Sequence, residues 1–245
     1  MNNGPPELWC LHGAVGEPAD WQPLATRLVA TGAIVRPLDL WRLLAGPPLP
    51  MWEFGRLLNV LARPPGGSPR VLIGYSMGGR LALHGLLHPA TGPWDAAVIV
   101  SAHPGLEDAG ERASRRAADA AWAMLANEAE WPAFLARWNA RPLLVGCPLD
   151  RHALVARRRE VARGFIDWSL GNQEPLWDRL AGLHTPVLWV AGERDGKFLA
   201  LAERAVAALP NGRLWVAPDA GHRVPWEAPV AFAAAVMEFL EPWSA

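Results

Sequence analysis

The sequence is poor in cysteine, in tyrosine and in long hydrophobic runs. It has 2 cysteines and 1 tyrosine among 245 residues. Cys10 and Cys147 do not form a metal-type cluster, and the apolar context of each predicts a buried free thiol. The longest apolar runs, such as residues 187–191, have the length of a strand. They are far shorter than the roughly 18 residues that a membrane span requires.

An excess of charge of one sign is also absent. Lys and Arg number 23 and Asp and Glu number 24, which gives a formal net charge of −1. This balance argues against general nucleic-acid binding, because such binding needs a broad basic field. Residues 1–6 show neither the basic nor the apolar segment of a signal peptide, so we expect a cytoplasmic protein. The 14 tryptophans are unusual, and composition alone assigns them no role.

Short apolar segments of strand length recur along the chain. Each is bounded by Gly, Pro or Asp, which is typical of parallel strands covered on both faces. The expected strands are Glu7–Leu11, Ala33–Leu38, Arg70–Gly74, Ala96–Ser101, Pro186–Ala191 and Arg213–Ala217. Helical patterns lie at Ala19–Thr31, Met51–Arg63, Met77–His88, Leu199–Leu209 and Pro229–Leu240. This alternation predicts an α/β fold whose mostly parallel sheet has about six strands and helices on both faces.

One long interval, between Ser101 and Pro186, breaks the alternation. Residues 107–170 within it are rich in Ala, Arg and Trp and have helical periodicity. A structureless loop of this length is improbable, so we expect a helical insertion above the carboxyl edge of the sheet, where open α/β sheets bind ligands. The chain would then comprise a core of residues 1–105 and 171–245 and a helical cap of residues 106–170. The Pro- and Gly-rich residues 64–69 predict a loop.

A nucleophile motif follows the third expected strand. Residues 74–78, Gly-Tyr-Ser-Met-Gly, fit the pattern G-x-S-x-G between an apolar run and a helical stretch, which is the context that the motif demands. The glycines permit a turn so tight that side chains at their positions would clash. The turn would hold the Ser76 hydroxyl clear of the sheet at a helix N-terminus. The backbone N–H of Met77 would then point at a developing oxyanion.

An acid and a base follow this serine in the chain order that the motif requires. Asp195 follows the fifth expected strand, and His222 follows the sixth. Both would lie at the same sheet edge as Ser76, with His222 accepting the serine proton and Asp195 orienting the imidazole. Glu193 and Asp219 are rival acids nearby, although Asp219 is close enough to His222 to shape the turn instead.

A second oxyanion donor is expected in the loop after the first strand. His12-Gly13-Ala14 follows that strand directly, and Ala14 is the candidate donor. We expect His12 to be structural. The remaining histidines have no matching partners and are expected at the surface or as satisfied core residues: His84, His88, His103, His152 and His184.

With these motifs the sequence resembles the α/β-hydrolase superfamily over nearly its whole length. It also resembles one branch, the 2-succinyl-6-hydroxy-2,4-cyclohexadiene-1-carboxylate synthases of menaquinone biosynthesis. Four segments carry the narrower resemblance, namely residues 74–80, 103–106, 192–198 and 220–222. The resemblance implies elimination of pyruvate from a succinylated, enolpyruvyl-bearing cyclohexene carboxylate. Ser76 would act through His222 as a base, with no acyl-enzyme, no metal and no cofactor.

The resemblance also implies side chains that bind this small, carboxylate-bearing substrate. Arginine suits that task, because its planar fork binds carboxylate through two hydrogen bonds. The positions that match the branch are Tyr75, Arg80, Arg115, Trp138 and Arg158. Arg116 is a rival of Arg115, and Arg157 is a rival of Arg158. Arginines in an Ala-rich helix also commonly form just a solvated face.

Three departures from the branch keep other functions open. The two leading strands common in the superfamily are absent, Asp39 lacks its usual Pro-Gly-His-Gly turn, and the residues after His222 are less polar. A carboxylesterase or thioesterase that hydrolyses small acyl esters through a Ser76 acyl-enzyme is the main alternative. A non-catalytic binding protein is a weaker one, because a binder needs no triad. Five tryptophans are expected to line the site, namely Trp122, Trp131, Trp138, Trp168 and Trp226, whereas Trp9, Trp189 and Trp215 are expected in the core.

Overall fold

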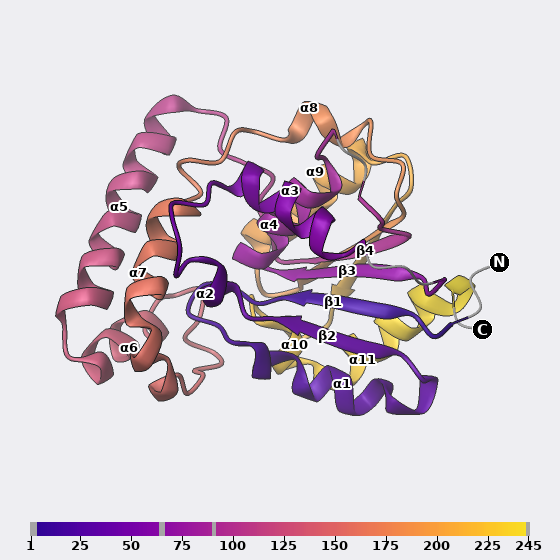
Figure 1. Cartoon of the computed structure of the whole chain (residues 1–245), viewed down its shortest axis with the longest axis horizontal. Coiled ribbons are helices and arrows are strands. Elements are labelled where there is room, and N and C mark those ends of the chain that lie inside the picture. The colour runs from indigo at the N-terminus through magenta and orange to yellow at the C-terminus, as the bar shows by residue number, and fades with distance from the viewer. Residues whose placement is uncertain (1–3, 64–66, 90–91, 244–245) are drawn as a thin grey trace.

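The computed structural model describes residues 4–63, 67–89 and 92–243 (Figure 1). One parallel sheet of six strands has the order β2-β1-β3-β4-β5-β6. The strands are β1 Glu7–Leu11, β2 Ile34–Leu38, β3 Arg70–Tyr75, β4 Ala96–Val100, β5 Val187–Gly192 and β6 Gly212–Ala217. The expected α/β architecture is confirmed, with each strand end within one residue of its prediction. Residues 1–3 of the N-terminal segment and 64–66 of the expected loop lie outside the described residues.

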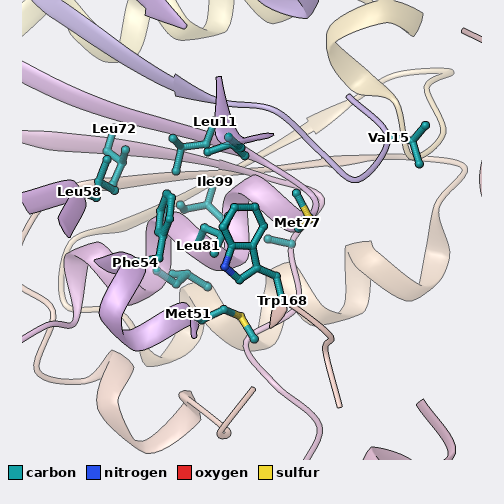
Figure 2. Packing of buried hydrophobic residues seen from close by; sticks show 14 of the residues in the cluster. Leu11, Val15, Met51, Phe54, Leu58, Leu72, Met77, Leu81, Ile99 and Trp168 are labelled. Atoms are coloured by element: carbon teal, nitrogen blue, oxygen red, sulfur yellow. The ribbon is translucent and has the colours of Figure 1, made fainter. Parts of the chain in front are cut away.

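Helices cover both faces of the sheet because successive strand residues point to opposite sides. On one face, α1 (Gln22–Leu28) and α11 (Pro229–Leu240) pack on an apolar layer that includes Cys10 and Ile73. On the other face, α3 (Met51–Leu61), α4 (Met77–Leu86) and α9 (Gly196–Ala208) pack on a second layer. Figure 2 shows this second layer, in which Leu72 and Ile99 from the strands meet Phe54 and Leu81 from the helices.

The remaining helical elements are short or belong to the insertion. They are η1 (Pro18–Trp21), η2 (Val29–Thr31), α2 (Leu40–Leu43), α5 (Ala109–Glu128), α6 (Trp131–Asn139), η3 (His152–Arg157), α7 (Arg158–Asp167), α8 (Trp177–Leu180), α10 (Val224–Glu227) and η4 (Glu241–Trp243). None of the helices in the described ranges is long and apolar enough to cross a membrane.

The predicted helices Met51–Arg63 and Met77–His88 each end two residues early, as α3 and α4, and two other predicted helices differ more. The helix expected at Ala19–Thr31 is split into η1, α1 and η2, because Pro18 and Pro23 each start a new turn and Gly32, with φ 73°, ends the last one. The helix expected from Leu199 begins at Gly196, because the Asp195 carboxylate caps it by accepting from the Phe198 N–H.

The insertion between β4 and β5 is helical, and residues 101–186 contain no strand. Figure 1 shows α5 and α7 side by side at the carboxyl end of the sheet. The Trp168 ring, just after α7, lies edge-on to Phe54 of α3 with ring centroids 5.4 Å apart. The apolar core is therefore continuous between the insertion and the sheet layer. The division into a core and a cap at the residues predicted above stays a proposal, and "cap" is used below for residues 106–170.

The neighbours β1 and β3 mark the place where the order of the strands reverses. From β1 the chain crosses to β2 on one side, and from β3 it continues through β4, β5 and β6 on the other side. Open α/β sheets bind ligands in the crevice outside the carboxyl ends of such a pair. Gly13 and Ser76 follow these two strands, so the predicted oxyanion loop and nucleophile face one crevice.

Candidate active site

Ser76 occupies a strained turn between β3 and α4. Its φ is 51°, in the left-handed region that L-residues seldom adopt. Glycine is required on both sides, because a Cβ at Gly74 would collide with the Gly78 carbonyl and one at Gly78 would collide with the Leu11 carbonyl. The Ser76 N–H donates to the Val100 carbonyl at 2.8 Å, which anchors the turn to β4. The result is a half-buried hydroxyl held at the N-terminus of α4.

His222 lies between Ser76 and Asp195. Its Nε2 is 3.1 Å from the Ser76 Oγ, and its Nδ1 is 2.7 Å from a carboxylate oxygen of Asp195. A carboxylate can only accept, so Nδ1 carries the proton and Nε2 is free to accept one from the serine. The rival acids do not contact this ring, since Glu193 accepts from the Asp219 N–H instead. The three predicted residues are therefore brought together in a linear hydrogen-bonded chain.

The surroundings of His222 keep the imidazole neutral and fixed. Burial lowers its pKa from the ordinary value of 6.5, and the hydrogen bond with Asp195 opposes this effect. The ring lies against Phe198 and Tyr75, with centroids 4.5 and 5.6 Å away. Glu227, which the sequence reasoning missed, accepts from the N–H groups of Gly221 and Arg223 and so orders the loop that carries the histidine.

Both predicted oxyanion donors line the cavity that contains Ser76. Met77 is the first residue of α4, so its N–H has no acceptor within the helix. Ala14 lies in the loop after β1, where Gly13 approaches Tyr75 so closely that a Cβ would be 2.7 Å from the ring. His12 anchors this loop, because its ring contacts the Gly13 carbonyl through Nδ1 and accepts from the Leu40 N–H through Nε2. The structural role expected for His12 agrees with these contacts.

The cavity at Ser76 has a volume of about 320 Å³ and an unbalanced charge. The sheet side contributes Gly13, Ala14, Tyr75, Ser76, Met77, Ser101, Phe198, His222 and Trp226, and the cap contributes Arg115, Trp138, Leu143, Leu144 and Leu149. The basic side chains in its lining are Arg80, Arg115, Arg141, Arg151, Lys197 and Arg223. Among the described residues that line it, Asp20 alone carries a carboxylate. Such a lining suits an anionic ligand.

Arg80 reaches the cavity but is already engaged by the protein. Its guanidinium donates to the Trp168 carbonyl at 2.8 Å and to the Gln173 amide oxygen at 3.3 Å. These acceptors are neutral, and no carboxylate among the described residues forms an ion pair with Arg80, although the charge of Asp119 acts on it from a distance. Burial and the neighbouring Arg115 lower its pKa to about 9. Arg80 therefore holds α4 to the residues that follow α7 and places a positive charge in the lining of the cavity.

The structure separates Arg115 from its rival. Arg115 lines the cavity, and its Nε donates to both oxygens of Asp119 at 2.9 Å. Asp119 also accepts from the Ser169 hydroxyl, so it is fixed in place. The terminal nitrogens of Arg115 have no partner among the described residues. Arg116 points elsewhere and donates to the Gly171 carbonyl.

The prediction that Arg158 lines the site is corrected by the structure. Its guanidinium donates to the carbonyls of Ala126 and Ala129 at 2.9 and 2.7 Å, which satisfies the C-terminus of α5. Arg157 forms long ion pairs with Asp39 and Glu160 instead. Neither side chain is part of the cavity lining.

The tryptophan prediction is corrected in part. Trp138 and Trp226 line the cavity. Trp122, Trp131 and Trp168 do not, because they pack against Phe134, Phe165 and Phe54 within the continuous apolar core. Helical periodicity identifies an apolar face, but it does not say whether that face meets a ligand or another helix.

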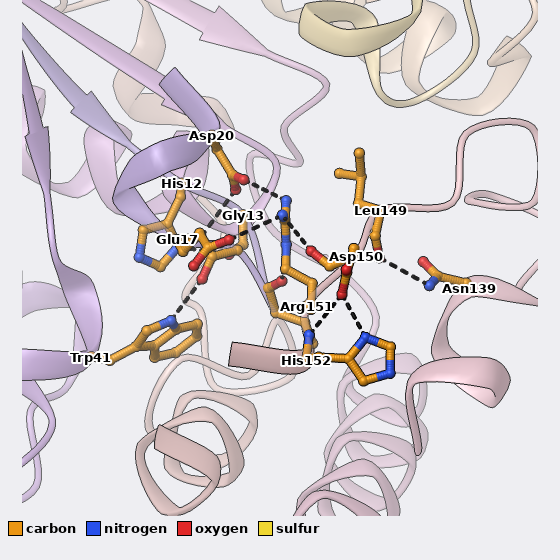
Figure 3. A network of polar contacts seen from close by, with 12 residues as sticks. His12, Gly13, Glu17, Asp20, Trp41, Asn139, Leu149, Asp150, Arg151 and His152 are labelled. Carbon is orange, nitrogen blue, oxygen red and sulfur yellow. Dashed lines mark hydrogen bonds and ion pairs between the residues drawn. The ribbon is translucent and has the colours of Figure 1, made fainter. Parts of the chain in front are cut away.

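Arg151 was missed by the sequence reasoning and crosses from the cap to the oxyanion loop. Figure 3 shows it reaching between Glu17 and Asp20, with which it forms ion pairs. Its Nε also donates to the Val15 carbonyl at 3.0 Å. Burial raises the pKa of the Asp20 carboxyl to about 6, although the Arg151 charge opposes this shift. No local pattern signals these contacts, because the partners lie more than 130 residues apart.

Other cavity residues were also missed. Ser101 has φ 48° at the end of β4, and its buried hydroxyl has no partner in the described chain. His103 is buried beside it and accepts from the Gly105 N–H, and burial lowers its pKa to about 4. Lys197 lies two residues after Asp195, and Arg223 follows His222 directly, so proximity to the triad is the signal that could have identified them. The described residues contain no cluster of His, Cys, Asp and Glu suited to a metal ion.

Comparisons with known proteins agree with this fold. The model of the alpha/beta hydrolase family matches residues 10–235. The solved structure of MenH from S. aureus superimposes with a TM-score of 0.84 over 99% of this chain and 96% of that one, at 22% identity. At that level of identity the likeness shows the shared fold.

Two curated relatives carry a more specific name. A 2-succinyl-6-hydroxy-2,4-cyclohexadiene-1-carboxylate synthase of Salmonella paratyphi C is 28% identical over 247 residues, or 97% of this chain and 94% of that protein. A Bacillus subtilis protein given the same name provisionally is 35% identical over 179 residues. That second match spans 69% of this chain and 65% of the relative.

Proposed function

Because the chain belongs to the alpha/beta hydrolase family, we propose that it is an enzyme that eliminates pyruvate from a succinylated, enolpyruvyl-bearing cyclohexene carboxylate. One observation carries the proposal. The hydrogen-bonded chain from Asp195 through His222 to Ser76 opens into a cavity whose basic side chains outnumber its carboxylates. The names of the curated relatives point to the same reaction.

In this proposal Ser76 and His222 act together as a general base. The Ser76 oxygen takes a proton from a ring carbon of the substrate while its own proton moves to the His222 Nε2, 3.1 Å away. The ring C–H electrons form the second ring double bond, and the C–O bond to the enolpyruvyl group breaks. The enolpyruvyl oxygen leaves with the electron pair of the C–O bond. The released enolate then takes up a proton and becomes pyruvate. No bond forms between the serine and the substrate.

The neutral state of His222 suits this role. A base must be unprotonated to accept, and burial lowers the pKa of this imidazole. Asp195 stabilises the imidazolium that forms when the proton arrives and holds the ring in the required tautomer. Removing a ring proton places negative charge on the keto oxygen of the succinyl group. The N–H groups of Ala14 and Met77 are the proposed donors to that oxygen.

The basic side chains would bind the carboxylates of the substrate. Arg115 offers free terminal nitrogens, and Arg80 supplies a buried positive charge. Tyr75 and Trp138 would enclose the ring of the substrate, since both line the cavity. Charges held in a cavity of low dielectric interact more strongly than they would in water.

Hydrolysis of a small acyl ester through a Ser76 acyl-enzyme is the second candidate. It is favoured by the apolar cap side of the cavity, where Leu143, Leu144 and Leu149 could receive an acyl chain. The same triad and oxyanion donors would serve that reaction. The two reactions differ in what the cavity must recognise, because an ester needs no cationic lining.

A paired assay on the wild-type protein tests the proposal. One arm follows pyruvate release from the enolpyruvyl cyclohexene substrate, and the other follows hydrolysis of p-nitrophenyl butyrate. We expect kcat/KM for pyruvate release to exceed that for the ester by at least about 100-fold. Efficient ester hydrolysis without pyruvate release would overturn the proposal in favour of the esterase.

A further inference from the structure

Arg141 lies just beyond α6 and points into the cavity of Ser76 without a partner of its own. It lines that cavity and is partly buried. Its guanidinium makes no hydrogen bond or ion pair with any residue that the structure describes. Arg151 and Arg158, by contrast, are engaged by carbonyl or carboxylate oxygens.

Two tryptophans hold this unpaired guanidinium in place. Its central carbon lies 4.5 Å from the ring centroid of Trp138 and 5.6 Å from that of Trp122. The two rings are perpendicular, with centroids 5.2 Å apart. A guanidinium held on aromatic faces keeps its in-plane N–H groups available, and those are the groups that bind a carboxylate with two parallel bonds.

The excess of positive charge around Arg141 favours binding of an anion. Burial and the nearby Arg115 lower the pKa of Arg141, and the Asp119 and Tyr75 side chains oppose this shift. Asp119 cannot neutralise both arginines, because its two oxygens already accept from Arg115 and Ser169. A partly buried cation beside a second cation is costly to keep unpaired, so an anionic ligand that binds here would relieve the cost.

We propose that Arg141 is a carboxylate-binding and specificity-determining residue of the cavity. It takes the place on the cap that the sequence resemblance assigned to Arg158. It binds a carboxylate of the substrate bidentately, beside the free terminal nitrogens of Arg115. This inference rests on the proposed function, because both require an anionic substrate. Arg141 is the group that would select such a substrate.

A binding experiment tests the inference without relying on the reaction. The probes are succinate, a dicarboxylate, and succinamide, its uncharged analogue, each titrated calorimetrically into the whole 245-residue chain. The variant is Arg141→Met, which keeps most of the side-chain length and removes the charge. The matched control is Arg137→Met, because Arg137 is an exposed arginine of α6, four residues before Arg141.

We expect succinate to bind the wild-type protein more tightly than succinamide. Arg141→Met should weaken succinate binding about tenfold or more, in line with a hydrogen bond to a charged group, and Arg137→Met should leave it within about twofold. Arg141→Lys should recover only part of the loss, because lysine keeps the charge without the fork. The Tm of Arg141→Met should equal or exceed that of the wild type, since an unpaired cation is removed.

Kinetics separate failure of this inference from failure of the proposed function. Arg141→Met should raise KM for pyruvate release about tenfold while kcat changes less than about threefold. If the wild type releases no pyruvate but succinate binding depends on Arg141, the proposed function fails and the subsite stands. If Arg141→Met leaves both succinate binding and KM unchanged, or weakens succinamide as much as succinate, the inference is overturned.

Discussion

The Nε of Arg151 in the cap donates to the carbonyl of Val15, 3.0 Å away, in the loop that carries Ala14. Val15 has φ 54°, which is unusual for a β-branched residue and must be maintained by its surroundings. The ion pairs of Arg151 with Glu17 and Asp20 hold the same loop. The cap therefore supports the loop that carries Ala14, one of the two proposed oxyanion donors.

Replacing Arg151 should lower the stability of the folded protein. Arg151→Met leaves the buried Asp20 carboxylate without its partner, so we expect the free energy of unfolding to fall by about 3 kcal/mol. Urea denaturation measures this change. Arg157→Met is the control, because its ion pairs are long and partly exposed, and it should cost less than about 1 kcal/mol. Equal losses in the two variants would show that Arg151 does not support the loop.

The activity should fall on the acid side as His222 takes up a proton. Burial lowers the pKa of His222, so kcat/KM should rise with pH through an apparent pKa below 6.5 and then level off. A pH–rate profile from pH 4 to 8 measures it. An inflection above 6.5 would contradict the assignment of His222 as the base.

Asp195→Asn should distinguish the catalytic role of this residue from its role as the N-cap of α9. Asparagine caps a helix as well as aspartate does, so α9 and the Tm should be preserved. The variant loses the carboxylate that fixes the His222 tautomer, so kcat should fall by about 10³- to 10⁴-fold. Glu193→Gln, which removes the charge of a rival acid, should leave kcat within about threefold. A large loss in Glu193→Gln and a small one in Asp195→Asn would reverse the assignment.

His84 should make the folded protein sensitive to acid. Both of its ring nitrogens are buried without a partner in the described chain, and burial lowers its pKa to about 3. The unfolded chain takes up a proton near pH 6.5 that the folded chain excludes, so stability falls as the pH drops below that value. His84→Leu should reduce the pH slope of the unfolding free energy by about 1.4 kcal/mol per unit near pH 5. An unchanged slope would show that the ring is protonated in the folded state.

Arg158 should matter for stability and not for substrate binding. Arg158→Met removes two hydrogen bonds at the C-terminus of α5, so we expect a loss of about 1–2 kcal/mol in unfolding free energy. KM for pyruvate release should stay within about twofold of the wild type. Steady-state kinetics of Arg158→Met and Arg141→Met, measured side by side, shows which of the two arginines binds the substrate. A tenfold rise in KM for Arg158→Met would restore the sequence-based assignment.

The sequence predicted those parts of the site that depend on local pattern. Strand length, the glycines around Ser76 and the order of Ser76, Asp195 and His222 follow from spacing along the chain. The orientation of Arg158 does not, because it depends on how α7 packs against the end of α5. The contacts of Arg151 do not follow from local pattern either, since its partners lie near the N-terminus, more than 130 residues away. Arg141 follows Trp138 by three residues, and this spacing is the signal in the sequence for their contact.

Pyruvate release by Ser76→Ala tests the central claim most directly. The substrate is the enolpyruvyl cyclohexene carboxylate, and pyruvate is followed by coupling to lactate dehydrogenase, with circular dichroism to verify folding. Wild-type protein should release pyruvate without an initial burst, because no acyl-enzyme forms, and Ser76→Ala should be slower by about 10³-fold or more. A folded Ser76→Ala protein that releases pyruvate at the wild-type rate would contradict the role of this serine and with it the proposed mechanism.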